Sequence, residues 1–137
     1  MKLSVSDTDD QALREAVLAG LVAHNEAAAG PGGYRPLNIA LHQDGRIAGG
    51  LIGYSFHRWL FIHLFHVDAA LRGIGIGTRM IGMAEDEARA RGCIGVHLDS
   101  FSFQARPFYE RHGYRVFGTL GDFPPGHMRY FLSKRIA

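Results

Sequence analysis

The order of its apolar segments predicts that this chain forms an α/β domain built on a mixed β-sheet. Two stretches carry apolar residues at helical spacing, and several shorter stretches have the alternating or continuous apolar character of strands. Turns rich in glycine or proline separate them. The resulting order, β-α-β-β-β-α-β-α-β-β, is typical of a layered α/β domain. The length of 137 residues fits a single domain covering residues 1–137.

The first half of the chain predicts one helix and four strands. Residues 2–6 are a short strand candidate, and acidic residues at 7–10 offer caps for a helix that runs to about Ala29. Residues 37–42 and 47–56 are expected to form a hairpin, because the Asp44-Gly45 pair between them is a turn signal. Residues 59–67 are apolar on both alternating faces, which predicts a central strand buried on each side.

The second half predicts two helices and three strands. Residues 78–91 are expected to form a helix that ends at Gly92. Two ion pairs between residues four positions apart, Glu85–Arg89 and Glu87–Arg91, are expected on its solvent side. A strand is predicted at 94–99, a short helix at 104–112, and two final strands at 114–120 and 128–133.

Composition excludes several classes of protein. The formal net charge of +2, with no basic tract, gives no reason to expect nucleic acid as a partner. No apolar run reaches membrane-spanning length and no signal peptide is visible, so we expect no membrane partner and a cytoplasmic location. The single cysteine, Cys93, fits a reducing compartment and is not expected to be a nucleophile. The eight histidines show no metal-ligand spacing, so no metal is expected.

A glycine-rich run between a predicted strand and a predicted helix carries the first functional signal. It consists of Arg72, Gly73, Ile74, Gly75, Ile76, Gly77 and Thr78. Such a turn leaves backbone N–H groups free at a helix start, where the helix dipole favours an anion. Neither the dinucleotide fingerprint nor the P-loop spacing fits, because position 80 is Met and no Gly-Lys-Ser/Thr follows. We therefore expect a phosphate or pyrophosphate ligand, bound mainly by backbone N–H groups and also by Arg72.

Arg72-x-x-Gly75-x-Gly77 resembles the acyl-CoA signature of the GCN5-related N-acetyltransferases, the GNAT family. The block from Ala105 to Tyr114, which contains Phe108-Tyr109-Glu110, looks like a second motif of that family in the right order and separation. The segments at 99–104 and 123–132 are similar to small bacterial members of unassigned substrate. The resemblance implies a sheet of about six to seven strands, helices on both of its faces, and a splayed fourth strand.

The resemblance also implies acetyl-CoA as co-substrate. Residues 72–78 would hold its pyrophosphate, and backbone groups of Phe65, His66 and Val67 would polarise the carbonyl and pair with the pantetheine amides. Ser102 stands where many relatives carry an Asn that contacts the pantetheine arm, although Ser can equally cap a helix.

Acetyl transfer to an amine needs a proton donor for the leaving thiolate and a base for the ammonium. The resemblance places the family's catalytic tyrosine at Tyr109, for which packing in the core is the alternative. Where related sequences often carry Glu or Asp, this chain has His63. A histidine can accept a proton near neutral pH. His66, which a regular strand would point to the opposite face unless a bulge intervened, and water are alternative bases.

The sequence therefore predicts an N-acetyltransferase acting on a primary amine of a small molecule or peptide. The alternative is a non-catalytic acyl-CoA-binding module with the same fold. A general nucleotide-phosphate binder is disfavoured because neither standard motif fits. The sequence leaves the acceptor open; candidates for contacting it are Tyr34, Arg35, Trp59, Phe101, Phe103, Phe123 and His127. Oligomeric state is also open, since the apolar final strands could pair with a second copy to form a homodimer.

Overall fold

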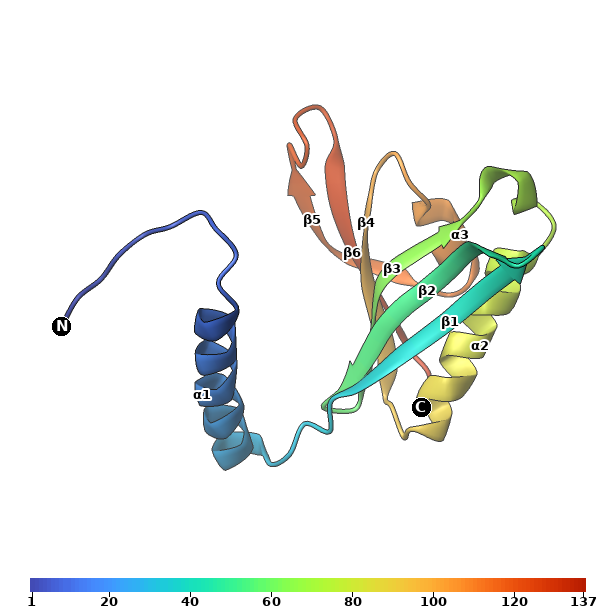
Figure 1. Ribbon diagram of the computed structural model, residues 1–137. Coiled ribbons are helices and arrows are strands. Elements are labelled where there is room, and N and C mark those ends of the chain that lie inside the picture. Colours follow the sequence, from blue (N-terminus) through green and yellow to red (C-terminus); the bar gives the residue numbers. More distant parts are fainter. The chain divides into compact units, whose positions relative to one another are not determined.

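A computed structural model describes all residues, 1–137, and divides the chain into two compact units, 1–32 and 33–137. The first unit contains helix α1, Gln11–Ala29 (Figure 1). Asp10 caps it, because its carboxylate accepts a hydrogen bond of 2.9 Å from the Leu13 N–H. The predicted helix and its cap are confirmed. The predicted strand at 2–6 is wrong: these residues form no ladder, and a strand needs a paired neighbour.

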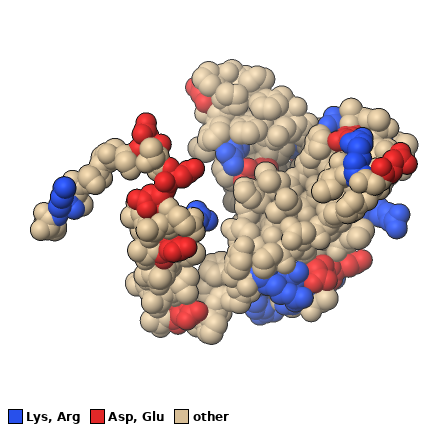
Figure 2. Space-filling view, in the orientation of Figure 1, with Lys and Arg blue, Asp and Glu red and all other residues tan.

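The first unit is acidic and its helix is amphipathic. Five acidic residues lie among its 32 positions against only two basic ones, and the acidic side chains are prominent in Figure 2. No residue of α1 is buried. Its larger apolar side chains are all exposed and lie at helical spacing: Leu13, Val17, Leu18, Leu21 and Val22. No helix of the protein is long and apolar enough to cross a membrane.

The second unit is built on a six-stranded sheet of order β1-β2-β3-β4-β6-β5. Its strands are β1 (Arg35–Gln43), β2 (Arg46–Phe56), β3 (Trp59–Val67), β4 (Gly95–Phe101), β5 (Arg115–Gly121) and β6 (Met128–Arg135). Only β3 and β4 pair in parallel, so the predicted mixed sheet is confirmed. The β1–β2 hairpin turns at Asp44 and Gly45, which both have positive φ as a tight two-residue turn requires.

Two helices cover one face of this sheet. Helix α2, Ile76–Ala90, and the short helix α3, Arg106–Arg111, contribute Met80, Ile81 and Tyr109 to a single core with the strands. A 3₁₀ turn, η1 (Ala69–Leu71), links β3 to α2. The opposite face carries half-buried aromatic groups, with Phe61 packed between Tyr54 and His97.

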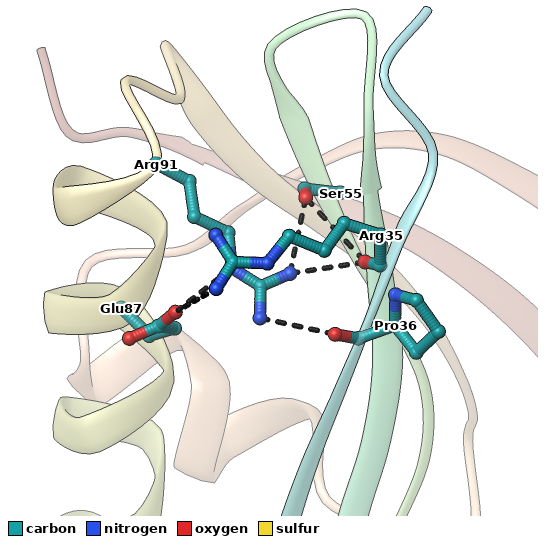
Figure 3. A network of polar contacts seen from close by, with 5 residues as sticks. All are labelled: Arg35, Pro36, Ser55, Glu87 and Arg91. Atoms are coloured by element: carbon teal, nitrogen blue, oxygen red, sulfur yellow. Dashed lines mark hydrogen bonds and ion pairs between the residues drawn. The ribbon is translucent and has the colours of Figure 1, made fainter.

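Arg91, at the C-terminal end of helix α2, connects this helix to the β1–β2 hairpin by hydrogen bonds (Figure 3). The Arg91 guanidinium donates to the carbonyl oxygens of Arg35 and Pro36, each at 3.0 Å, and to Ser55 Oγ at 3.1 Å. Its Nε bonds Glu87 at 2.9 Å, as the sequence predicts. The side chain is only 9% exposed, so this pair lies against the sheet and the prediction of a purely solvent-facing pair is wrong.

Glu85 also departs from the expected solvent-facing position. It is buried, and its two oxygens accept hydrogen bonds from Tyr114 Oη at 2.9 Å and Lys134 Nζ at 2.8 Å. The predicted partner Arg89 is further away, at 3.9 Å. A carboxylate can be buried here because it has both a cation and a hydroxyl donor. Glu85 therefore ties α2 to the last strand.

Candidate active site

The parallel strands β3 and β4 separate where the site is built. They are paired from Trp59 with Gly95 as far as Ile62 with Leu98, and then diverge. β3 continues to Val67 along β2, while β4 continues to Phe101 along β6. The side of residues 63–67 that faces β4 therefore has no partner strand. We call this place, where β3 and β4 have separated, the opening. The predicted splay is confirmed, and the splayed strand is the third here because residues 2–6 form no strand.

The glycine-rich loop sits directly after β3 and opens helix α2. The first helical hydrogen bond of α2 runs from Arg79 N to Gly75 O, and no side chain caps the helix. The N–H groups of residues 75–78 therefore precede the helical ladder and are free to bind an anion. Gly73 and Gly75 have φ of 78° and 86°, a conformation that only glycine adopts cheaply. The loop thus has the backbone geometry that its sequence predicts.

Arg72 holds this loop to the splayed strand. Its Nε donates to the Val67 carbonyl oxygen at 2.8 Å, while the Asp68 N–H bonds Ala48 O at 2.9 Å on β2. The guanidinium is thereby positioned through one nitrogen, and its other nitrogens remain available to an anion. Arg72 consequently has a structural function in addition to the expected ligand contact.

Helix α3 packs against the first turn of α2. A Cβ built on Gly77 would lie 3.4 Å from the Phe108 ring, and Thr78 Oγ1 is 3.1 Å from His112 Nε2. The Thr78 hydroxyl is therefore engaged by α3, whereas its N–H is free. The glycine-rich loop and the helix that carries Tyr109 are therefore in direct contact.

Tyr109 packs its ring into the core and leaves its hydroxyl without a protein hydrogen-bond partner. The ring packs against Phe108, Tyr114 and, from β3, Phe65. The side chain is buried, yet no protein group bonds the hydroxyl and that oxygen is not sealed from solvent. Burial, together with the charge of Asp99, raises the pKa of Tyr109 to about 12. The phenol is therefore protonated at neutral pH and can donate a hydrogen bond.

A bulge decides where the two candidate bases lie. Ile52 pairs with Leu64 and Gly53 with Ile62, so His63 is an extra residue in β3. The His63 ring stacks on Phe61 at 5.8 Å, on the face away from the core. His66 pairs with Gly50 on that same face and lies 3.3 Å from Asp68 Oδ1. The regular-strand expectation of opposite faces is wrong because the bulge shifts the alternation by one residue.

Ser102 lies away from any helix start. Ala105 is the N-cap of α3, so the capping alternative for Ser102 is wrong. Its Oγ accepts a hydrogen bond of 3.1 Å from Met128 N and lies 3.4 Å from His127 Nδ1. Ser102 therefore joins the end of β4 to the start of β6, beside the opening between the strands.

Sequence reasoning missed the pair formed by Asp99 and Arg129. Asp99 follows the last residue of β4 that pairs with β3, and Arg129 Nε donates to its Oδ1 at 3.0 Å. The two residues are 30 positions apart in sequence and so left no local signal, although the alternation of β4 places Asp99 on the same face as His97. Burial lowers the pKa of His97, against the opposing effect of Asp99.

Other potentially reactive groups do not converge on this opening. Cys93 is buried, and burial raises the pKa of its thiol. No group of three or more His, Cys, Asp or Glu side chains is placed to hold a metal ion.

A glycine-rich helix start with free N–H groups beside a splayed parallel strand pair is the arrangement that the resemblance to acyl-CoA-binding α/β domains implies. Comparison with known proteins agrees with this class. Residues 9–114 match the Acetyltransferase (GNAT) family. The chain is 38% identical over 136 residues to Acetyltransferase Atu2258 of Agrobacterium fabrum, covering 98% of this chain and 99% of that protein.

Two further similarities extend the comparison. Blasticidin-S acetyltransferase of Streptomyces morookaense is 42% identical over 107 residues, which cover 74% of this chain and 79% of that protein. A crystal structure of a candidate acetyltransferase from Agrobacterium tumefaciens superposes with a TM-score of 0.94 at 38% identity, covering 99% of this chain and all of the other. The chain belongs to the GNAT family of acetyltransferases. Members of this family use acetyl-CoA.

Proposed function

We propose that this protein transfers the acetyl group of acetyl-CoA directly to a primary amine of a small molecule. The observation that carries the proposal is the Tyr109 hydroxyl, which has no protein partner although its ring is held in the core beside the splayed strand. The family match begins at residue 9, which supports residues 1–137 acting as one acetyltransferase domain.

The residues present fit an acyl-CoA ligand. The N–H groups of residues 75–78 and the free nitrogens of Arg72 suit the pyrophosphate. A Cβ built on Gly73 or Gly75 would meet no atom within 4 Å, so the backbone of this loop is open to a bulky anion. The unpaired side of residues 63–67, which includes Phe65, His66 and Val67, suits the amides of the pantetheine arm, which would add to it as a strand does.

Bound acetyl-CoA supplies an activated acetyl group as a thioester. Backbone N–H groups of β3 stabilise the charge that develops on the carbonyl oxygen. His63, with His66 or water as alternatives, accepts the proton that the ammonium must lose before the nitrogen attacks. The C–N bond then forms, the C–S bond breaks, and Tyr109 directs its O–H at the departing sulfur, which leaves as a thiol.

The raised pKa of Tyr109 refines its role. A phenol with a pKa of about 12 is a weaker acid than an ordinary thiol, whose pKa is about 8.5. Complete transfer of the phenolic proton is therefore uphill. We propose that Tyr109 remains neutral and acts as a hydrogen-bond donor, while the proton that completes the thiol comes from the attacking nitrogen.

The relatives support a small-molecule acceptor. Blasticidin-S acetyltransferase is named for a small-molecule substrate, and 107 residues of this chain align with it. We therefore propose that the acceptor is an amine of a small molecule and not the N-terminal amine of a protein. The alternative of a non-catalytic acyl-CoA-binding module predicts the same ligand but no turnover.

Release of CoA thiol over a panel of amines tests the proposal. The panel should include blasticidin S and simple primary amines, each beside its hydroxyl analogue, with mass spectrometry of the products. Thiol release and an acetylated amine are expected with amines alone. Binding of acetyl-CoA without turnover of any amine would overturn the transferase proposal in favour of the binding module.

A further inference from the structure

Strand β4 places a carboxylate at the point where the two parallel strands separate. Leu98 is the last residue of β4 that pairs with β3, and Asp99 is the next residue. Because Val96 and Leu98 face the core, alternation puts Asp99 on the opposite face with His97. His63, the candidate base, is the corresponding residue just beyond the pairing on β3 and lies on that same face.

Arg129 of β6 binds this carboxylate through one oxygen only. Its Nε donates to Asp99 Oδ1 at 3.0 Å, and its Nη2 donates to the same oxygen. Asp99 Oδ2 has no protein partner, and it is not sealed from solvent. The Asp99 side chain is 23% exposed. One oxygen is therefore fixed while the other remains available to a ligand.

Aromatic rings hold the arginine in place. The Arg129 guanidinium carbon lies 5.2 Å from the ring centroid of Phe101, 4.8 Å from that of Phe123 and 5.8 Å from that of Phe131. A planar cation packed among three rings loses its freedom of orientation. The Asp99–Arg129 pair is consequently not a mobile surface ion pair, and the free oxygen points in a defined direction.

The same rings extend into an aromatic rim beside Asp99. Phe101 and Phe103 stack at 5.2 Å with an interplanar angle of 9°, and Phe103 lies 5.0 Å from His127. Phe103 is exposed. A flat or apolar group could pack on this rim with little reorganisation, because the Phe101 and Phe103 rings are already parallel.

The charge of Asp99 also reaches the proposed catalytic centre. It contributes to the raised pKa of Tyr109 and acts on His97 in the direction that favours the charged ring. The Asp99 carboxylate therefore acts electrostatically on both side chains. A cation bound at Asp99 would lie within the same field.

We propose that Asp99 binds the ammonium group of the acceptor through Oδ2, with Arg129 as its positioning residue and the Phe101–Phe103 rim packing against the acceptor's body. The acceptor class is then a primary amine carried on a flat or apolar group. This inference rests on the proposed acetyl transfer, whereas its test measures amine binding without turnover.

Binding of a minimal probe pair tests the assignment. Benzylammonium and benzyl alcohol are titrated separately into the CoA-saturated protein and into the ligand-free protein, and the backbone amide signals of Asp99, Phe101 and Phe103 are followed by NMR. The ammonium is expected to shift these signals with an affinity at least about tenfold higher than the alcohol, as expected for a hydrogen bond to a charged group. Asp99→Asn should abolish that difference.

Matched variants keep the result interpretable. Asp44→Asn removes one negative charge at the hairpin turn, where Asn-Gly is as favourable as Asp-Gly, and should retain the preference for the ammonium. Arg129→Lys keeps the charge but loses the planar fork, and should weaken the preference. The proposal is overturned if the ammonium binds no better than the alcohol, if the shifts map elsewhere, or if folded Asp99→Asn retains the preference. A failure of amine turnover alone would count against the proposed function and not against this binding site.

Discussion

The ring of Tyr109 on α3 lies 6.5 Å from the ring of Phe65 on β3, centroid to centroid, at an angle of 60°. This contact fixes the phenol relative to the strand whose free side faces the opening. Phe108 packs against the same Phe65 ring, at 6.1 Å, and meets α2 at Gly77. The proposed hydrogen-bond donor Tyr109, the splayed strand and the glycine-rich loop at residues 72–78 are therefore held by one set of packing contacts.

Replacing Tyr109 with Phe tests the hydrogen-bond-donor role. The variant keeps the ring and its contacts but removes the hydroxyl, so we expect kcat to fall by about a hundredfold, as for the loss of one hydrogen-bond donor to developing charge. The affinity for acetyl-CoA, measured by calorimetry, should change less than about twofold. Tyr130→Phe is the control, since its hydroxyl contacts only Met128 Sδ. Loss of acetyl-CoA affinity in Tyr109→Phe would indicate a structural tyrosine instead.

The two histidines of β3 can be separated by their pH–rate profiles. If His63 accepts the ammonium proton, His63→Gln should lower kcat/KM and remove the acidic limb of the profile. His66→Gln should retain that limb, because the proposal assigns the base to His63. An unchanged acidic limb in His63→Gln, together with its loss in His66→Gln, would assign the base to His66. Retention in both variants would point to water.

The buried Glu85 predicts a large stability effect at a distance from the site. Lys134→Met leaves the Glu85 carboxylate with the Tyr114 hydroxyl but without its close cation. We expect a loss of about 3 kcal/mol in the free energy of unfolding, measured by urea titration. Adding Glu85→Gln should recover most of that loss. An effect below 1 kcal/mol for Lys134→Met would mean that solvent already screens the pair.

Two buried tyrosines predict loss of stability in alkali. The pKa of Tyr109 is raised to about 12, and burial next to Glu85 raises that of Tyr114 further. Above about pH 10 the unfolded chain loses phenolic protons that the folded protein retains, so the free energy of unfolding should fall as the pH rises. Urea titrations between pH 9 and pH 11 should show a steeper fall for the wild type than for Tyr109→Phe. Equal slopes would mean that the Tyr109 pKa is not raised.

Local sequence signals predicted most of the elements because their causes are local. The bounds of β3 agree with the structure, and α1 begins at the Asp10 cap and ends at Gly30. The backbone geometry of the glycine-rich loop was predictable because Gly73 and Gly75 adopt positive φ, a conformation that glycine favours. The strand at residues 2–6 was wrongly predicted because a strand depends on a partner that its own sequence does not contain.

Partners distant in sequence account for what was missed. Glu85 has the same four-residue spacing to Arg89 as a solvent-facing pair, and its burial depends on Tyr114 and Lys134, which are 29 and 49 positions away. The faces of His63 and His66 depend on a bulge whose register is set by β2. Asp99 acquires its geometry from Arg129, so no motif around it could reveal the site.

Calorimetric titration of acetyl-CoA tests most directly whether the loop at residues 72–78 holds the donor. Gly75→Ala is compared with Gly92→Ala, because both glycines have positive φ, 86° and 74°, and both substitutions cost about 1 kcal/mol of stability. Of these two glycines, only Gly75 belongs to the loop at residues 72–78. We predict micromolar binding by the wild type and Gly92→Ala, and binding at least about tenfold weaker by Gly75→Ala. Absence of micromolar binding by the folded wild type, or equal affinity in all three proteins, would contradict the account.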